Sequence, residues 1–184
     1  VASQPPSPID VLLPHTISSI ILVLLVVGLS ATLLAPNRST RVLDFTDMGH
    51  ASTAGLPHDR IEAVALSLIA YSAAEGADVV VVEIADGVLQ RETATLLASP
   101  AFRAAIDGVL FAAGDAPGAI AGRDWLQEHG HNVIGVSGLV SASPLATREA
   151  SAAMGQPVLL LDQLRDPVFA PQLAFAATPA IAKA

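Results

Sequence analysis

Polar side chains that could do chemistry follow directly after short apolar runs of this sequence. The clearest pair is Glu83 and Asp86, which come after four consecutive valines in the stretch DVVVVEIADG. Three further polar groups, at residues 46–53, 114–115 and 137–141, follow other apolar runs in the same way. In parallel α/β sheets, ligands bind outside the carboxyl ends of the strands. We therefore expect any binding or catalytic site at that edge of a sheet.

Other chemistries receive less support from the residue types and their spacing. Asp44, Asp47 and His50 could approach one another as metal ligands, but such spacing is also common in ordinary loops. Neither Ser52 nor Ser137 lies in the G-x-S-x-G pattern of a hydrolase nucleophile. The chain has no cysteine, which excludes thiolate nucleophiles, thiolate metal sites and disulfides. Strand-end carboxylates are the remaining candidates, and in many turns such carboxylates serve only as caps.

A parallel sheet with flanking helices would place these polar groups along one edge. Residues 37–161 contain five short apolar runs that alternate with segments of helical period. This alternation predicts an α/β domain with an open, mostly parallel five-stranded sheet. The predicted strands are 41–46, 78–85, 108–112, 132–136 and 157–161, and the predicted helices are 60–74, 91–99, 100–106, 117–129 and 144–155. For residues 162–184 the sequence predicts only weak helix and coil.

Several helix ends are marked by residues that favour caps. Asp115 and Ser143 are expected to cap the helices that follow them. Gly76 and Gly130 are expected to end two of the helices, because glycine readily adopts the backbone conformation found there. Three histidines are expected on the surface or at helix ends, namely His58, His129 and His131.

An uncharged segment precedes this domain. No Asp, Glu, Lys or Arg occurs between Asp10 and Arg38, and residues 17–35 have the sequence ISSIILVLLVVGLSATLLA. As a helix this segment would be about 28 Å long, close to the ~30 Å hydrocarbon thickness of a bilayer. We therefore predict a single transmembrane helix over 17–35, with a buried core helix as the main alternative. Residues 1–16, rich in Pro and Ser, would form an extended extracytoplasmic tail.

The residues in and around this segment predict its orientation and its partners. Arg38 and Arg41 follow the segment, whereas the residues before it include no Lys or Arg. Because Lys and Arg near a span favour the cytoplasmic side, the α/β domain would lie in the cytoplasm, at the inner (cytoplasmic) membrane. Gly28, Ser30 and Ala31 form a small-residue patch where a helix of an integral membrane protein could pack.

The charge of the chain argues against one class of partner. The formal net charge is −8, with 9 Lys and Arg against 17 Asp and Glu, and Lys183 is the only lysine. An acidic chain without clusters of basic residues is not expected to bind nucleic acid.

Three stretches carry a resemblance to a known family. The stretch VVVVEIADGVLQRET, with VLDFTDMGHASTAG before it and GVSGLVSASPLATREA after it, resembles the C-terminal part of a P-loop family related to dethiobiotin synthetase. The resemblance covers roughly residues 41–161. It implies that the acidic residue ending the central strand, here Glu83 or Asp86, helps to hold Mg²⁺ beside nucleotide phosphates.

The sequence departs from this family at its most important motif. A P-loop requires G-x-x-x-x-G-K-[ST], whose lysine contacts the β- and γ-phosphates, and this chain contains no such motif. The predicted membrane span occupies the place of the family's phosphate-binding strand, loop and helix. We therefore expect a degenerate nucleotide-binding domain that holds no cofactor.

These observations leave three hypotheses about function. The leading one is a non-enzymatic accessory or structural subunit of a membrane protein complex, for example a respiratory or photosynthetic one. The second is part of an ATP-dependent ligase or carboxylase, in which another subunit supplies the P-loop and this chain supplies Glu83 and Asp86. The third is a small-molecule sensor that uses a pocket at the strand ends.

Overall fold

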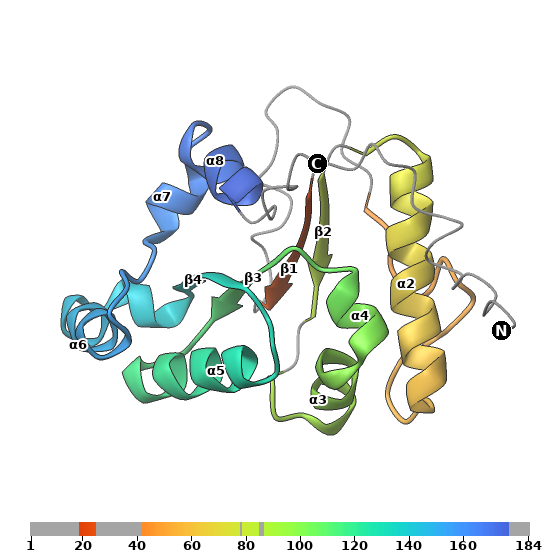
Figure 1. Cartoon of the computed structure of the whole chain (residues 1–184), viewed down its shortest axis with the longest axis horizontal. Helices are drawn as coiled ribbons and strands as arrows, with labels where there is room; N and C mark the ends of the chain where they lie inside the picture. Colours follow the sequence, from red (N-terminus) through yellow and green to blue (C-terminus); the bar gives the residue numbers. More distant parts are fainter. Residues whose placement is uncertain (1–18, 25–41, 78, 85–86, 177–184) are drawn as a thin grey trace, which may run out of the picture.

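A four-stranded parallel sheet forms the centre of the molecule (Figure 1). The computed structural model describes residues 19–24, 42–77, 79–84 and 87–176. The strands are β1 (Ser19–Leu24), β2 (Val79–Glu83), β3 (Gly108–Ala112) and β4 (Val133–Ser137), in the order β2-β1-β3-β4. The described helices are α2 (His58–Ala74), α3 (Arg91–Ala98), α4 (Pro100–Ala104), α5 (Ala116–Glu128), the 3-10 helix η1 (Leu139–Ala142), α6 (Pro144–Met154), α7 (Leu161–Arg165) and α8 (Phe169–Ala176).

Strand β1 corrects the prediction of a continuous helix over 17–35. Ser19–Leu24 lies between two neighbours, with Ile21 aligned with Val81 of β2 and with Gly108 of β3. The helix prediction is therefore wrong for these six residues. The other residues of the predicted span, including Gly28, Ser30 and Ala31, lie outside the described residues. In the described part of the chain, no helix combines the length and the apolar character needed to cross a bilayer.

The error over β1 has a physical reason. A central parallel strand is covered on both faces, so its sequence is an almost unbroken apolar run, as in a buried or membrane-spanning helix. Within SIILVL, the β-branched residues Ile20, Ile21 and Val23 favour a strand. This local preference is weak, and β1 is specified mainly by its two distant partners.

The first and last predicted strands, 41–46 and 157–161, do not form as regular strands in the described residues. Val42–Asp44 has no regular structure and residues 45–49 form a turn, in which the Asp44 carboxylate accepts hydrogen bonds from the amide and hydroxyl of Thr46. Such local bonds compete with pairing to a neighbouring strand. In the second segment, Val158 makes only an isolated bridge with Val136. The chain then turns into α7, where the Gln163 side chain accepts the Leu160 amide.

The helix predictions agree closely with the structure. The Asp115 carboxylate accepts the Gly118 amide at 2.7 Å, which confirms it as the cap of α5. The Ser143 hydroxyl likewise accepts the Ala146 amide at 3.3 Å at the start of α6. Gly130 has the positive φ expected where a helix ends. These local signals therefore fix the ends of the helices.

Helices α2–α6 cover one face of the sheet with a single apolar cluster. Val80, Val109, Phe111 and Val136 contribute the strand side chains of this cluster. The helices contribute buried residues that include Ile61, Ile69, Leu96, Leu97, Phe102, Leu126 and Ala150. Helix α5 approaches β3 so closely that a Cβ atom at Gly122 would lie 2.2 Å from the Phe111 ring, and glycine is therefore required there.

The opposite face of the sheet packs against the C-terminal helices. Leu110 of β3 forms a second buried cluster with Leu159 and Leu164, and Phe169 and Leu173 pack on it. Helix α8 also contacts β1. The folded unit thus extends beyond residues 37–161 in both directions, because β1 lies inside the sheet and α7–α8 cover it.

Candidate functional site

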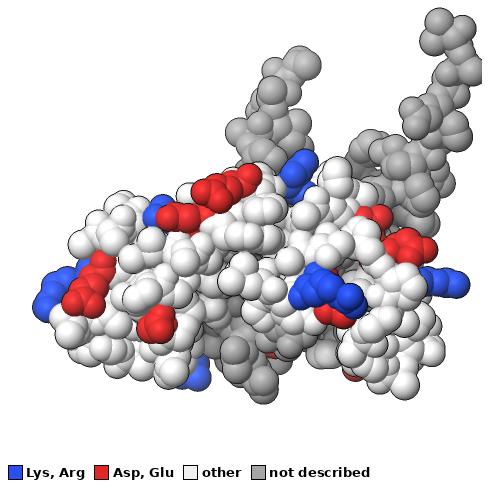
Figure 2. All heavy atoms as spheres, turned by 90° about the horizontal axis from the view of Figure 1, so that it is seen from below, with Lys and Arg blue, Asp and Glu red and all other residues white. Residues whose placement is uncertain are grey.

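The strand order places a topological switch point at the carboxyl ends of β1 and β3. The chain leaves β1 toward β2 on one side, whereas it leaves β3 toward β4 on the other side. At such a switch point the loops diverge, and ligands of parallel α/β sheets bind there. We call the described residues that follow β2, β3 and β4, as far as the first turns of α3, α5 and α6, the carboxyl edge. Figure 2 looks toward this edge and shows acidic and basic side chains scattered between wide uncharged areas.

The helix N-termini at the carboxyl edge are occupied by the chain's own side chains. The Gln90 side chain accepts the Thr93 amide of α3 at 2.9 Å, and Asp115 and Ser143 cap α5 and α6. Free amides at a helix start would be natural partners of a phosphate group. Here one of those donors in each helix is already used, and the Asp115 carboxylate adds a negative charge that disfavours an anion.

A second carboxylate lies at the start of α3. The Glu92 side chain accepts its own backbone amide, which lowers its pKa, and a hydrogen bond from Arg91 lowers it further. The Arg91 guanidinium lies 3.1 Å from Glu92, so the two charges largely offset each other. The first turns of α3 and α5 therefore present no net positive charge to a ligand.

The hydroxyl groups after β4 serve the structure. Ser137 is fully buried and its hydroxyl donates to the Leu159 carbonyl at 2.7 Å. The Ser141 hydroxyl donates to the Gly138 carbonyl at 2.7 Å within the same turn. Because each hydroxyl is committed to a backbone acceptor, neither is arranged as a nucleophile.

The predicted carboxylate site is only partly described. Glu83 is exposed and ends β2, where it is aligned with Val23 of β1, next to the switch point. Asp86 lies outside the described residues. The sequence therefore correctly placed Glu83 at a strand end, but β2 is an edge strand of the described sheet and not the central strand that was expected. A role of Glu83 in holding Mg²⁺ stays a prediction.

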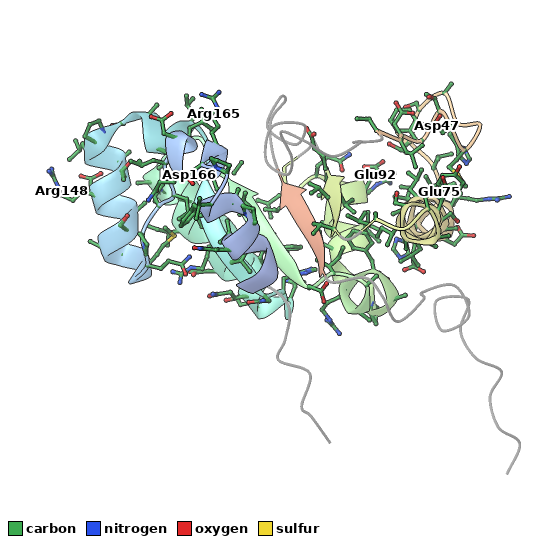
Figure 3. The ribbon with its side chains drawn as sticks, turned by 90° about the horizontal axis from the view of Figure 1, so that it is seen from above. Asp47, Glu75, Glu92, Arg148, Arg165 and Asp166 are labelled. Atoms are coloured by element: carbon green, nitrogen blue, oxygen red, sulfur yellow. The ribbon has the colours of Figure 1, made fainter. Side chains whose placement is uncertain are left out.

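The other candidate ligands do not converge on one site. Asp44 and Asp47 form a local turn in which the Asp47 carboxylate accepts the Asp44 amide at 2.8 Å. The hydrogen bond from the Thr46 hydroxyl is the main cause that lowers the pKa of Asp44. Figure 3 shows Asp47 near α2, Glu92 nearer the middle of the molecule and Arg148 at the far end. Over the described ranges, no group of three His, Asp or Glu side chains could hold a metal ion.

Exposed leucines are the feature of the carboxyl edge that sequence reasoning missed. Leu89 lies just before α3 and is 78% exposed, and Leu139 directly follows the turn after β4 and is 74% exposed. Leu145, in the first turn of α6, is 54% exposed. Their apolar character is visible in the sequence, but their exposure depends on how the helices are placed.

Comparison with protein-family models, with curated proteins and with solved structures gives no match to this chain.

Proposed function

We propose that the chain is a non-catalytic accessory subunit that binds a protein partner through the carboxyl edge of its sheet. The observation that supports this proposal is the exposure of Leu89 and Leu139 at that edge. Exposed apolar residues that gather on one surface are typical of protein interfaces. Gln90, Asp115 and Ser137 of the same edge are already paired within the chain, which favours an apolar contact over a small polar ligand.

The dimensions of the edge suit a protein interface. Neighbouring strands lie about 4.8 Å apart, so the ends of β2 and β4 are separated by about 14 Å. An interface of the usual size covers about 800 Å² on each partner, so one partner could reach the loops that follow both strands. Burying a leucine side chain contributes about 1.5–3 kcal/mol, so these residues would supply a substantial part of the affinity.

The proposal predicts a clear difference between two surface variants. Leu139→Asp should abolish co-purification of the partner, because it would bury a charge without a counter-charge in the interface. Val168→Asp, between α7 and α8, should retain the partner, although Val168 is also 66% exposed. Both variants should unfold at the same temperature as the wild type, since neither side chain belongs to the core.

The measurement is quantitative mass spectrometry of the affinity-purified full chain. Purification is done in parallel from soluble extract and from detergent-solubilised membranes, which also tests the predicted integral membrane partner. The proposal fails if no protein co-purifies in stoichiometric amount, or if Leu139→Asp retains the same partner as Val168→Asp.

The position of β1 favours a second candidate. Strand β1 comes from the segment that stands where the resembled P-loop family would have its phosphate-binding strand, and it lies beside β2, which ends at exposed Glu83. In this case a partner subunit would supply the P-loop and this chain would supply a ligand to Mg²⁺. The Asp115 carboxylate at the start of α5 counts against an anionic ligand, so we rank this candidate second.

Nucleotide binding separates the two candidates. The second candidate predicts that the complex with its partner binds Mg-ATP in calorimetry, and that Glu83→Ala weakens binding at least about tenfold by removing a metal ligand. Glu149→Ala, an exposed carboxylate on α6, is the matched control and should bind as the wild type does. Absence of binding by the complex would eliminate this candidate and leave the first unaffected.

A further inference from the structure

The turn between α5 and β4 contains a buried histidine. His131 was expected on the surface or at a helix end; it does lie just beyond the end of α5, but it is only 6% exposed. Its Nε2 atom lies 2.8 Å from the carbonyl oxygen of Leu97, in the last turn of α3, and donates a hydrogen bond to it. The side chain therefore connects a turn at the amino end of β4 to a helix far away in the sequence.

Two further hydrogen bonds hold the same turn. The Arg103 guanidinium of α4 donates to the His129 carbonyl at 3.1 Å. The Asn132 side chain donates to the Asp107 carbonyl at 3.0 Å. We call residues 129–132 with these three side-chain bonds the latch, because they tie the end of α5 to α3, to α4 and to the turn before β3.

The surroundings of His131 disfavour its charged form. Burial lowers its pKa below the ordinary value of 6.5, and the hydrogen bond to the Leu97 carbonyl opposes this only in part. The ionisable groups that act on it are Arg103 from α4 and His129 from α5, and both lower the pKa further. Because an opened latch would expose His131 to water, the closed form is favoured above the ordinary pKa. The free-energy difference that favours the closed form over the opened form decreases as the pH falls from 6.5 toward the lowered pKa.

We infer that the latch is an acid-sensitive device that holds α3 and α4 against α5 at neutral pH and releases them on acidification. Protonation would place a positive charge on the buried His131 ring, which Arg103 and His129 already disfavour. Helix α3 runs about 12 Å from the latch to Gln90 and Leu89 at the carboxyl edge, so release would also loosen that edge. The latch itself does not depend on the proposed function, although its effect on the carboxyl edge does.

Hydrogen exchange of the full chain tests this inference. Between about pH 7.5 and about pH 5.5, where a histidine changes charge, the amides of α3 and α4 should lose protection severalfold after correction for intrinsic exchange. Helix α6 provides the internal reference and should change much less. In His131→Gln, which keeps a donor for the Leu97 carbonyl but cannot be charged, this pH dependence should disappear. His58→Gln is the matched control for α3 and should keep the wild-type pH dependence there, because the His58 side chain is 43% exposed and faces Glu62 of its own helix.

The inference is overturned if the wild type shows no selective loss of protection, or if the loss persists in His131→Gln. Should His131→Gln fail to fold, Arg103→Gln provides a second test. It removes the neighbouring charge and retains a donor for the His129 carbonyl. The NMR titration midpoint of the His131 ring should then rise, and an unchanged midpoint would also overturn the inference. No partner or nucleotide is involved, so these results are independent of the proposed function.

Discussion

Replacement of Phe102 by alanine is expected to lower the free energy of unfolding by about 3–5 kcal/mol, the usual cost of removing a buried phenyl ring. Phe102 is fully buried and belongs to the cluster that covers one face of the sheet. It is the buried residue of α4, which is only five residues long, and Ser99 caps that helix by accepting the Phe102 amide. Its cluster is built from strands and helices of several parts of the chain, which limits how far the cavity can collapse, so we expect a cost near the upper end of the range.

Urea unfolding followed by circular dichroism measures this loss. Leu139→Ala is the matched control, because that apolar side chain is exposed and should change stability by less than about 0.5 kcal/mol. A loss below about 1 kcal/mol for Phe102→Ala would contradict the packing of α4 described above. The native state of domains of this size is usually stable by only 5–15 kcal/mol, so the variant should also unfold at a markedly lower temperature.

Gly138→Ala should destabilise the fold by at least about 3 kcal/mol, from the sum of backbone strain and a steric clash. Gly138 has φ 94° and ψ −156°, a conformation that is essentially restricted to glycine. A Cβ atom there would also lie 2.8 Å from both the amide nitrogen and the carbonyl oxygen of Ala113. Those atoms cannot rotate away, because the nitrogen donates to Ser137 and the oxygen accepts from Val140.

The control for this variant lies one residue beyond Ala113. A Cβ atom at Gly114 would meet no atom within 4 Å, and Gly114 has no positive φ. Gly114→Ala should therefore change the unfolding free energy by less than about 0.5 kcal/mol in the same thermal or urea experiment. Equal stability of the two variants would show that the turn after β4 is not packed against β3 as described.

The features that could be predicted from the sequence are those specified by nearby residues. Asp115, Ser143 and Gly130 act on helix ends a few residues away, and the structure confirms each of them. The strand Gly108–Ala112 also has the predicted bounds, because its apolar run lies between two segments with a helical pattern. Short-range hydrogen bonds and backbone preferences are sufficient for such features.

The predictions that were wrong concern features that depend on distant residues, or on local hydrogen bonds that compete with strand pairing. Ser19–Leu24 becomes a strand because β2 and β3 pair with it, and neither partner can be inferred from that stretch alone. Val42–Thr46 has the composition of a strand, but the carboxylate of Asp44 binds the backbone locally instead. Pattern reasoning detects apolar character in both cases and cannot decide which contacts satisfy it.

The candidate site was predictable only in its position. Glu83 lies at a strand end as expected, whereas the pairing of the Ser137 hydroxyl with the Leu159 carbonyl requires the folded chain. The exposure of Leu89 and Leu139 likewise depends on where α3 and η1 are placed. These two kinds of information, satisfied polar groups and uncovered apolar groups, are what favour a protein partner over a nucleotide.

The central position of β1 has a consequence for biosynthesis. β1 precedes both of its neighbours in the chain, and β3 ends at Ala112. A ribosome that adds about 5–20 residues each second needs roughly 5–20 s to make the intervening residues. During this interval the nascent polypeptide carries an aliphatic segment that lacks one or both of its strand partners, which is the kind of segment that chaperones bind and that aggregates when they are scarce.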